Sequence, residues 1–119
     1  MGNPVTVYGI GNCDTVQKAR AWLAEHQVDY RFHDFAKAGV PQDRATAWVA
    51  AGGWESLVNR KGTTWRKLDS RVRDGVSDVS SALALMQSHP SVIKRPVVEW
   101  GAAITVGFDP QQWAKLPWR

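Results

Sequence analysis

The spacing of apolar residues changes from a strand-like to a helix-like pattern near the start of the chain. Apolar side chains recur at alternate positions over Val5–Ile10, which is typical of a half-buried strand. Val16, Ala19 and Leu23 then follow one face of a helix, which we expect to end near His26. The pattern therefore predicts a strand, a tight turn and an amphipathic helix.

The predicted turn carries the one cysteine of the chain, Cys13. Gly9 and Gly11 favour a tight turn, and Asp14 followed by Gln17 is typical of a helix cap. A thiol at the start of a helix is more acidic than a free one, because the helix end favours the thiolate. The N–H groups at that end also form an anion site. We therefore predict that Cys13 is a nucleophile.

Three further strands are predicted, over residues 28–35, 92–100 and 103–106. A helix joins the first strand to the strand at 28–35, so these two strands are expected to run parallel. Gly101 separates the last two strands by a short turn, which predicts a hairpin.

The predicted helices gather in the middle of the chain. One helix begins at Pro41 and ends at Gly52-Gly53, and short helical pieces follow over residues 54–68. A further helix is capped by Ser77 and stops at His89-Pro90. A last helix begins at Asp109-Pro110 and ends before Pro117.

This order of elements is that of an α/β, thioredoxin-like (glutaredoxin-like) fold. Its sheet is mixed and four-stranded, and a helical insertion over about residues 40–89 separates the second and third strands. The chain of 119 residues contains no low-complexity segment and no linker. We therefore expect a single domain over residues 1–119.

Three segments of the chain together resemble the arsenate reductase-like family. They are GIGNCDTVQKA at 9–19, NRKGTTWRKL at 59–68 and HPSVIKRPVV at 89–98. The family includes glutaredoxin-dependent arsenate reductases (ArsC), Spx-type transcription regulators and YffB proteins, and the resemblance is closest to the YffB type. It extends from near the first residue to the last helix.

The resemblance implies the roles of several site residues. Cys13 is the expected catalytic nucleophile, and Arg60 and Arg95, together with Asn12, are the expected anion-binding residues. Guanidinium groups suit this role because they match oxyanions with paired hydrogen bonds and stabilise a nearby thiolate. Arsenate reductases carry a third arginine in the closing hairpin. Residues 101–107 of this chain contain none, so the resemblance does not extend to arsenate as the substrate.

Val16 stands where a dithiol oxidoreductase carries its second cysteine. An external thiol must therefore release any adduct at Cys13. The resemblance implies glutathione as this co-substrate, with Arg95 and Pro96 binding it, glutaredoxin as a further partner, and a small anionic or disulfide substrate. Pro96 is expected to be cis by resemblance, since sequence alone does not decide the isomer.

Three interpretations of the function remain open at this stage. One is a glutathione-dependent thiol reductase, and another is an Spx-like, non-enzymatic regulator that binds RNA polymerase. The third is a structural relic that keeps the fold without activity. Val16 argues against the redox-sensing form of that regulator, because sensing members use a Cys-x-x-Cys pair, but polymerase binding is compatible with it.

The composition of the chain indicates which kinds of partner to expect. The net charge of +4 suits an anionic substrate, and the basic residues are scattered along the chain, so no nucleic-acid partner is expected. One cysteine fits a reducing compartment, and no apolar run has transmembrane length, so we expect a cytoplasmic monomer without membrane contact.

The three histidines lack ligand spacing, so no metal and no bound cofactor are predicted. The seven tryptophans are scattered and are expected to pack in the core.

Overall fold

A computed structural model describes residues 5–101 and 103–116. The chain divides into two compact units. The first unit combines the residues before and including Asp34 with those from Arg95 onwards, and the second unit is Phe35–Lys94. The last helix ends at Ala114, before Pro117 as predicted. The expected packing of Trp118 lies outside the described residues.

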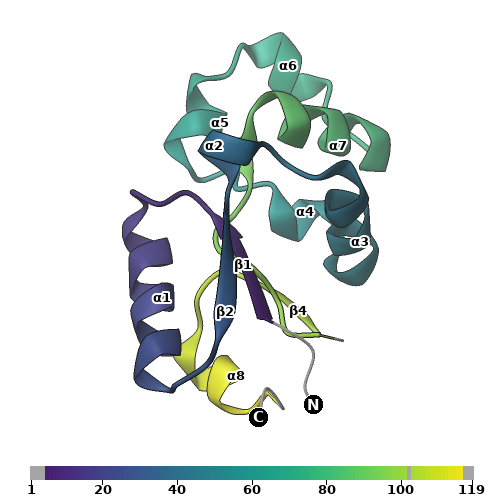
Figure 1. The fold of residues 1–119 in the computed structure, drawn as a ribbon. Coiled ribbons are helices and arrows are strands. Elements are labelled where there is room, and N and C mark those ends of the chain that lie inside the picture. The colour runs from purple at the N-terminus through teal and green to yellow at the C-terminus, as the bar shows by residue number, and fades with distance from the viewer. Residues whose placement is uncertain (1–4, 102, 117–119) are drawn as a thin grey trace. The chain divides into compact units, whose positions relative to one another are not determined.

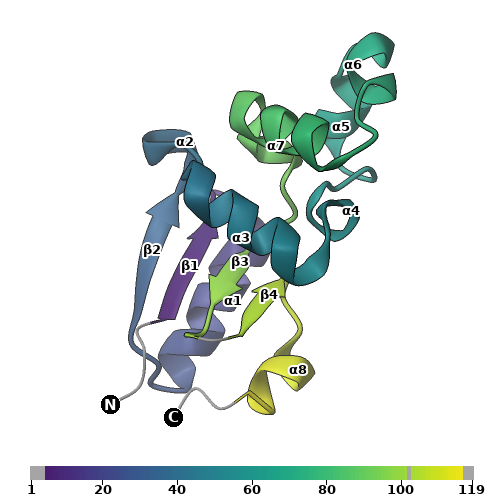
Figure 2. The ribbon, with the colours of Figure 1, turned by 90° about the vertical axis from the view of Figure 1, so that its right-hand side faces the viewer.

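The first unit is built on a mixed four-stranded sheet (Figure 1), and its strand order β2-β1-β3-β4 can be followed in Figure 2. The strands are β1 (Val5–Gly9), β2 (Tyr30–Asp34), β3 (Val97–Glu99) and β4 (Ile104–Val106). β1 runs parallel to β2 and antiparallel to β3, and β3 and β4 form an antiparallel hairpin. The predicted mixed sheet, the parallel pair and the hairpin are confirmed.

Two helices cover this sheet through one apolar cluster. They are α1 (Asp14–Glu25) and α8 (Pro110–Ala114), and Leu23 of α1 packs in the same cluster as Val7 of β1. Trp113 of α8 is fully buried, and its ring meets Trp22, Trp100 and Phe108 edge-on at 4.9–5.4 Å between ring centroids. Such aromatic pairs stabilise the unit beyond the area that they bury.

The second unit is helical (Figure 2). Its elements are α2 (Phe35–Ala38), α3 (Gln42–Gly52), α4 (Trp54–Leu57), α5 (Thr63–Lys67), α6 (Ser70–Asp74), α7 (Val79–Ser88) and a 3₁₀ turn η1 (Pro90–Val92). Trp48 of α3 is 1% exposed, and its ring lies 6.1 Å from that of Phe35. This unit matches the helical insertion that the apolar pattern predicts.

Several predicted boundaries are wrong at the ends of elements. Phe35 begins α2 instead of ending β2, because its ring packs on Trp48. Val92 belongs to the turn η1, so β3 is shorter than predicted. Asp78, not Ser77, caps α7, since its carboxylate accepts the Ser81 N–H at 2.8 Å and the Ser81 hydroxyl accepts the Asp78 N–H in return. A carboxylate in that position also suits the helix dipole.

The expected packing of the tryptophans is confirmed at three positions, Trp48, Trp100 and Trp113, which are buried. Among the described residues, no helix combines the length and the apolar character needed to cross a bilayer.

Candidate functional site

Cys13 occupies the last position before α1, at the end of the loop that leaves β1. Its φ and ψ of −84° and 126° are extended, as is usual for a helix N-cap residue. Its N–H donates to the Ile10 carbonyl at 3.1 Å, and its own carbonyl accepts the first helical hydrogen bond, from the Gln17 N–H at 2.9 Å. The side chain is partly exposed. The loop therefore presents a reachable sulfur at the positive end of a helix.

Cys13 is the N-cap residue of α1, but its sulfur makes no side-chain cap hydrogen bond to the helix. The backbone N–H groups of Thr15 and Val16, the second and third helical residues, act on the sulfur by favouring its thiolate. The predicted capping pair is therefore wrong. Asp14 is the first helical residue, one position too late to cap, and the Gln17 side chain donates to the Gly11 carbonyl instead.

These contacts lower the pKa of the Cys13 thiol below its usual value. Partial burial opposes the shift and raises the pKa. The N–H of Val16, the hydrogen bond and positive charge of Arg95, and the N–H of Thr15 lower it and prevail. The lowered pKa agrees with the expectation for a thiol at the start of a helix. It increases the fraction of Cys13 present as thiolate, which is the nucleophilic form.

Arg95 comes from the opposite end of the sequence and meets Cys13 directly before β3. Its guanidinium donates a hydrogen bond to the cysteine sulfur. The following peptide bond, Arg95-Pro96, is cis, as expected from the resemblance. Pro96 is buried, and its carbonyl accepts the Gly107 N–H at 2.9 Å. The structure thus brings together Cys13, Arg95 and Pro96, while Asn12 is exposed beside the cysteine.

Gly9 is needed for space, not for turn conformation. Neither Gly9 nor Gly11 has a positive φ. A Cβ on Gly9 would lie 2.8 Å from Cγ2 of Val16, a fully buried residue of α1. Since real Cβ atoms do not approach so closely, glycine is what lets the first turn of α1 pack on the end of β1.

Arg60 belongs to the second unit, in the loop after α4. It is exposed, and its guanidinium lies 5.2 Å from the centre of the Trp54 ring. The loop is held by the Asn59 side chain, which accepts the Lys61 N–H at 3.2 Å, and by Arg66, which donates to the Lys61 carbonyl at 2.6 Å. Arg60 and Lys61 line a cavity of about 400 Å³ together with Lys94. Glu55 lines the same cavity, so three basic side chains and one acidic side chain border it, a balance that suits an anion. The predicted role of Arg60 stays a prediction.

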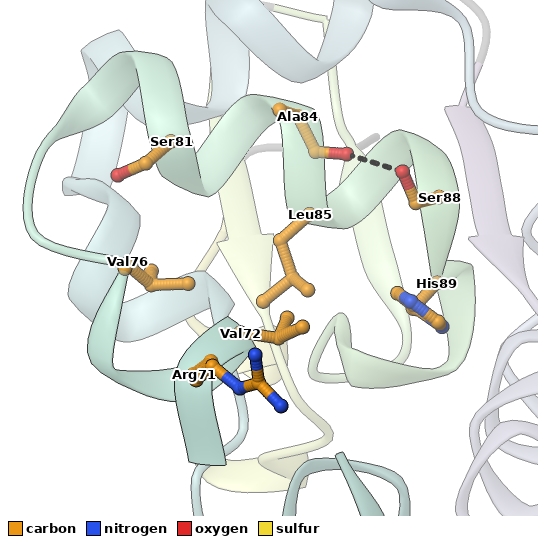
Figure 3. Close-up of a pocket in the computed structure, with 9 residues that line it drawn as sticks. Arg71, Val72, Val76, Ser81, Ala84, Leu85, Ser88 and His89 are labelled. Carbon is orange, nitrogen blue, oxygen red and sulfur yellow. Dashed lines mark hydrogen bonds between the residues drawn. The ribbon is translucent and has the colours of Figure 1, made fainter. Parts of the chain in front are cut away.

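A second cavity of the helical unit, about 370 Å³, lies between α6 and α7 (Figure 3). Val72, Val76 and Leu85 supply apolar lining, and the Ser88 hydroxyl donates to the Ala84 carbonyl at 3.0 Å. None of its lining residues is a cysteine, so this cavity offers no thiol chemistry. Within residues 5–101 and 103–116, no cluster of His, Cys, Asp or Glu is arranged to hold a metal ion.

The sequence analysis missed Asp34 and gave Gln17 another role. Asp34, the last residue of β2, accepts the Gly11 N–H at 3.2 Å, and the Gln17 side chain donates to the Gly11 carbonyl at the same distance. A signal for Asp34 existed in principle. The carboxyl ends of parallel strands lie at the same edge of a sheet, so the end of β2 must come near the loop that follows β1.

Comparison with known proteins agrees with the resemblance. A sequence model of the ArsC family matches residues 8–116. An uncharacterized protein of Haemophilus influenzae is 38% identical over 109 residues, covering 92% of this chain and 95% of the relative. The global transcriptional regulator Spx of Streptococcus pyogenes is 26% identical over 107 residues, covering 88% of this chain and 78% of Spx.

Solved structures show the same similarity. A YFFB (PA3664) protein is 45% identical with a TM-score of 0.88, covering 92% of this chain and 96% of the other. An arsenate reductase (ArsC) related protein from Brucella melitensis is 47% identical with a TM-score of 0.73, covering 96% and 97% of the two chains. The thioredoxin-like α/β fold predicted from the order of elements is confirmed.

Proposed function

Because the chain belongs to the ArsC family, we propose that it is a glutathione-dependent thiol reductase with Cys13 as its nucleophile. The environment of the Cys13 sulfur carries the proposal. Two backbone N–H groups and the guanidinium of Arg95 favour its thiolate form, and the thiolate is the form that attacks. The same N–H groups and Arg95 suit an anionic substrate.

The first proposed step forms a mixed disulfide. The Cys13 thiolate attacks one sulfur of a small disulfide substrate, the substrate S–S bond breaks, and the other half leaves as a thiolate that carries the electron pair. Arg95 stabilises the attacking thiolate and binds an anionic group of the substrate, with Asn12 beside it. Arg60, on the basic loop of the second unit, is proposed as a further anion-binding residue.

The second proposed step needs an external thiol. Position 16 holds a valine that is fully buried against Gly9, so the chain has no resolving thiol there. A glutathione thiolate attacks the substrate-derived sulfur of the mixed disulfide, and the Cys13 thiolate leaves with the electron pair. Arg95 and Pro96 are the proposed contacts for glutathione, with glutaredoxin as a further partner. A monomer in the cytoplasm, where glutathione is reduced, fits this chemistry.

The proposal is tested with oxidised glutathione and with a glutathionylated peptide. The wild-type chain should gain one glutathione at Cys13, seen by intact mass, and should turn over the peptide in the presence of reduced glutathione. Cys13→Ser should do neither. The proposal fails if the wild-type chain forms no adduct under conditions that modify a free cysteine peptide, or if Cys13→Ser retains turnover. Capture of an RNA polymerase subunit without turnover would instead favour the Spx-like regulator.

A further inference from the structure

The backbone N–H and the backbone carbonyl of Gly11 are both bound by side chains from outside the loop. Oδ2 of Asp34 accepts the Gly11 N–H at 3.2 Å. Nε2 of Gln17 donates to the Gly11 carbonyl, also at 3.2 Å. The two side chains come from different elements, β2 and α1, so Gly11 is held on both sides.

The register of the parallel strands brings Asp34 to this loop. Asp34 pairs with Gly9, two residues before Gly11, so the carboxylate at the end of β2 lies where the chain leaves β1. A Cβ on Gly11 would lie 3.2 Å from Oδ2 of Asp34. The carboxylate thus packs closely on the backbone that it binds, and a side chain at position 11 would have to displace it by a few tenths of an ångström.

The remaining hydrogen bonds of the loop make it a short, fixed bridge to the nucleophile. The Cys13 N–H donates to the Ile10 carbonyl, and the Gln17 N–H donates to the Cys13 carbonyl. Backbone hydrogen bonds therefore define the turn on both sides of the cysteine. Gln17 therefore binds the loop twice, through its backbone and through its side chain. A rotation of either peptide group that flanks Gly11 would strain or break one of the two side-chain hydrogen bonds.

We propose that Asp34 and Gln17 are positioning residues, which hold the loop Gly11–Cys13 so that the cysteine sulfur faces the N–H groups of α1 and the guanidinium of Arg95. The proposal deepens the proposed function, on which it rests, because it says what orients the nucleophile. Neither side chain is needed to touch the substrate. Their role is exerted through Gly11.

Charge and position predict opposite effects for Asp34. As an anion of the same loop environment, Asp34 would disfavour the Cys13 thiolate, so removing its charge alone would lower the pKa of Cys13. Through its hydrogen bond to the Gly11 N–H, Asp34 keeps the Cys13 sulfur beside the groups that favour its thiolate. Removing that hydrogen bond should therefore raise the pKa of Cys13. A substitution that keeps the acceptor oxygen but removes the charge separates the two effects.

The experiment compares Asp34→Ala, Asp34→Asn and Gln17→Met in the full chain. Asn keeps an oxygen that accepts the Gly11 N–H, and Met keeps the length of Gln but donates no hydrogen bond. Asp29→Ala is the matched control, because it removes an exposed carboxylate just before β2. The rate of alkylation of Cys13 by iodoacetamide is measured against pH, and stability by urea unfolding.

Asp34→Ala should move the inflection of the alkylation profile upward, towards the value of about 8.5 for a free thiol. The thiolate at pH 7 should then fall towards the few per cent of an ordinary cysteine. Gln17→Met should shift the inflection in the same direction by less, because the Asp34 bond remains. Asp34→Asn should retain the wild-type inflection or fall slightly below it, and Asp29→Ala should leave it unchanged.

Two results would overturn the proposal. A downward shift in both Asp34 variants would show that Asp34 acts through its charge alone. An unmoved inflection in Asp34→Ala and Gln17→Met, even with reduced stability, would make both residues purely structural. The alkylation profile requires neither glutathione nor turnover, so its outcome is separate from the adduct test of the proposed function.

Discussion

The two units of the chain differ in both architecture and charge. Residues 1–34 and 95–119 carry six Lys or Arg and six Asp or Glu, whereas Phe35–Lys94 carries nine and five. The whole net charge of +4 therefore lies on the helical unit, while the sheet unit holds Cys13 and Arg95. The proposed thiol chemistry would depend on a few directed hydrogen bonds in a unit without net charge, and the excess positive charge that would attract an anion lies on the other unit.

The core of the helical unit should be separable from the thiol chemistry. Trp48→Ala removes a buried indole and should lower the free energy of unfolding by about 3–5 kcal/mol. The pKa of Cys13 in the folded protein should stay lowered, because its causes lie in the sheet unit. Urea unfolding measures the loss of stability, and the pH profile of Cys13 alkylation measures the thiol pKa. Trp48→Phe is used for the alkylation profile, because it removes less buried volume than Trp48→Ala and should leave the protein folded. A raised Cys13 pKa in Trp48→Phe would contradict the separation.

The two predicted anion-binding arginines should behave differently. Arg95→Ala should raise the pKa of Cys13, because it removes a hydrogen bond and a positive charge from the sulfur. It should also weaken anion binding by about 1.5–3 kcal/mol. Arg60→Ala should weaken anion binding while the alkylation inflection stays in place.

Arg95→Lys is the matched variant, since it keeps the charge and loses the planar fork, and it should recover only part of the effect. If Arg95→Ala lowers the melting temperature and leaves the inflection where it was, Arg95 is a structural residue.

The close contact between β1 and α1 should be revealed by overpacking. Gly9→Ala places a Cβ against Val16 and should cost about 1–3 kcal/mol of stability. Adding Val16→Ala removes the clashing methyl groups, so the double variant should be more stable than the sum of the two single effects predicts. Additive effects, measured by urea unfolding, would mean that the contact is not the reason for glycine at this position.

The smallest effect concerns the cap of α1. Cys13→Ser should be more stable than Cys13→Ala by about 0.5–2 kcal/mol, because serine is a preferred N-cap residue whose hydroxyl accepts a helix N–H. Both variants should lack thiol reactivity. Equal stabilities of the Ser and Ala variants would show that residue 13 does not cap the helix.

The difference in stability between the wild-type chain and Cys13→Ser should depend on pH. The folded-state pKa of Cys13 is lowered, so its thiolate contributes stability above the unfolded value of about 8.5, and this contribution is lost as pH falls through the folded pKa. The stability of the wild-type chain relative to Cys13→Ser should therefore rise with pH across that window. A constant difference in unfolding free energy would contradict the lowered pKa.

The local pattern of the sequence was sufficient for much of the fold. The strand, turn and helix around Cys13, the hairpin and the last helix all follow from spacing and capping over a few residues, and these signals are short-range. The pairing of Arg95 with Cys13 came from family resemblance. Spacing alone does not bring together two residues so far apart in the chain.

What the sequence left open depends on contacts between distant residues. Spacing does not show that Cys13, not Asp14, is the N-cap residue of α1, or that Gly9 is required by the packing of Val16. Nor does it show that Asp34 holds Gly11, because that contact depends on the parallel register of β1 and β2. Hydrogen bonds and close packing act over a few ångströms. Such pairs are therefore defined only after the strands and α1 have come together.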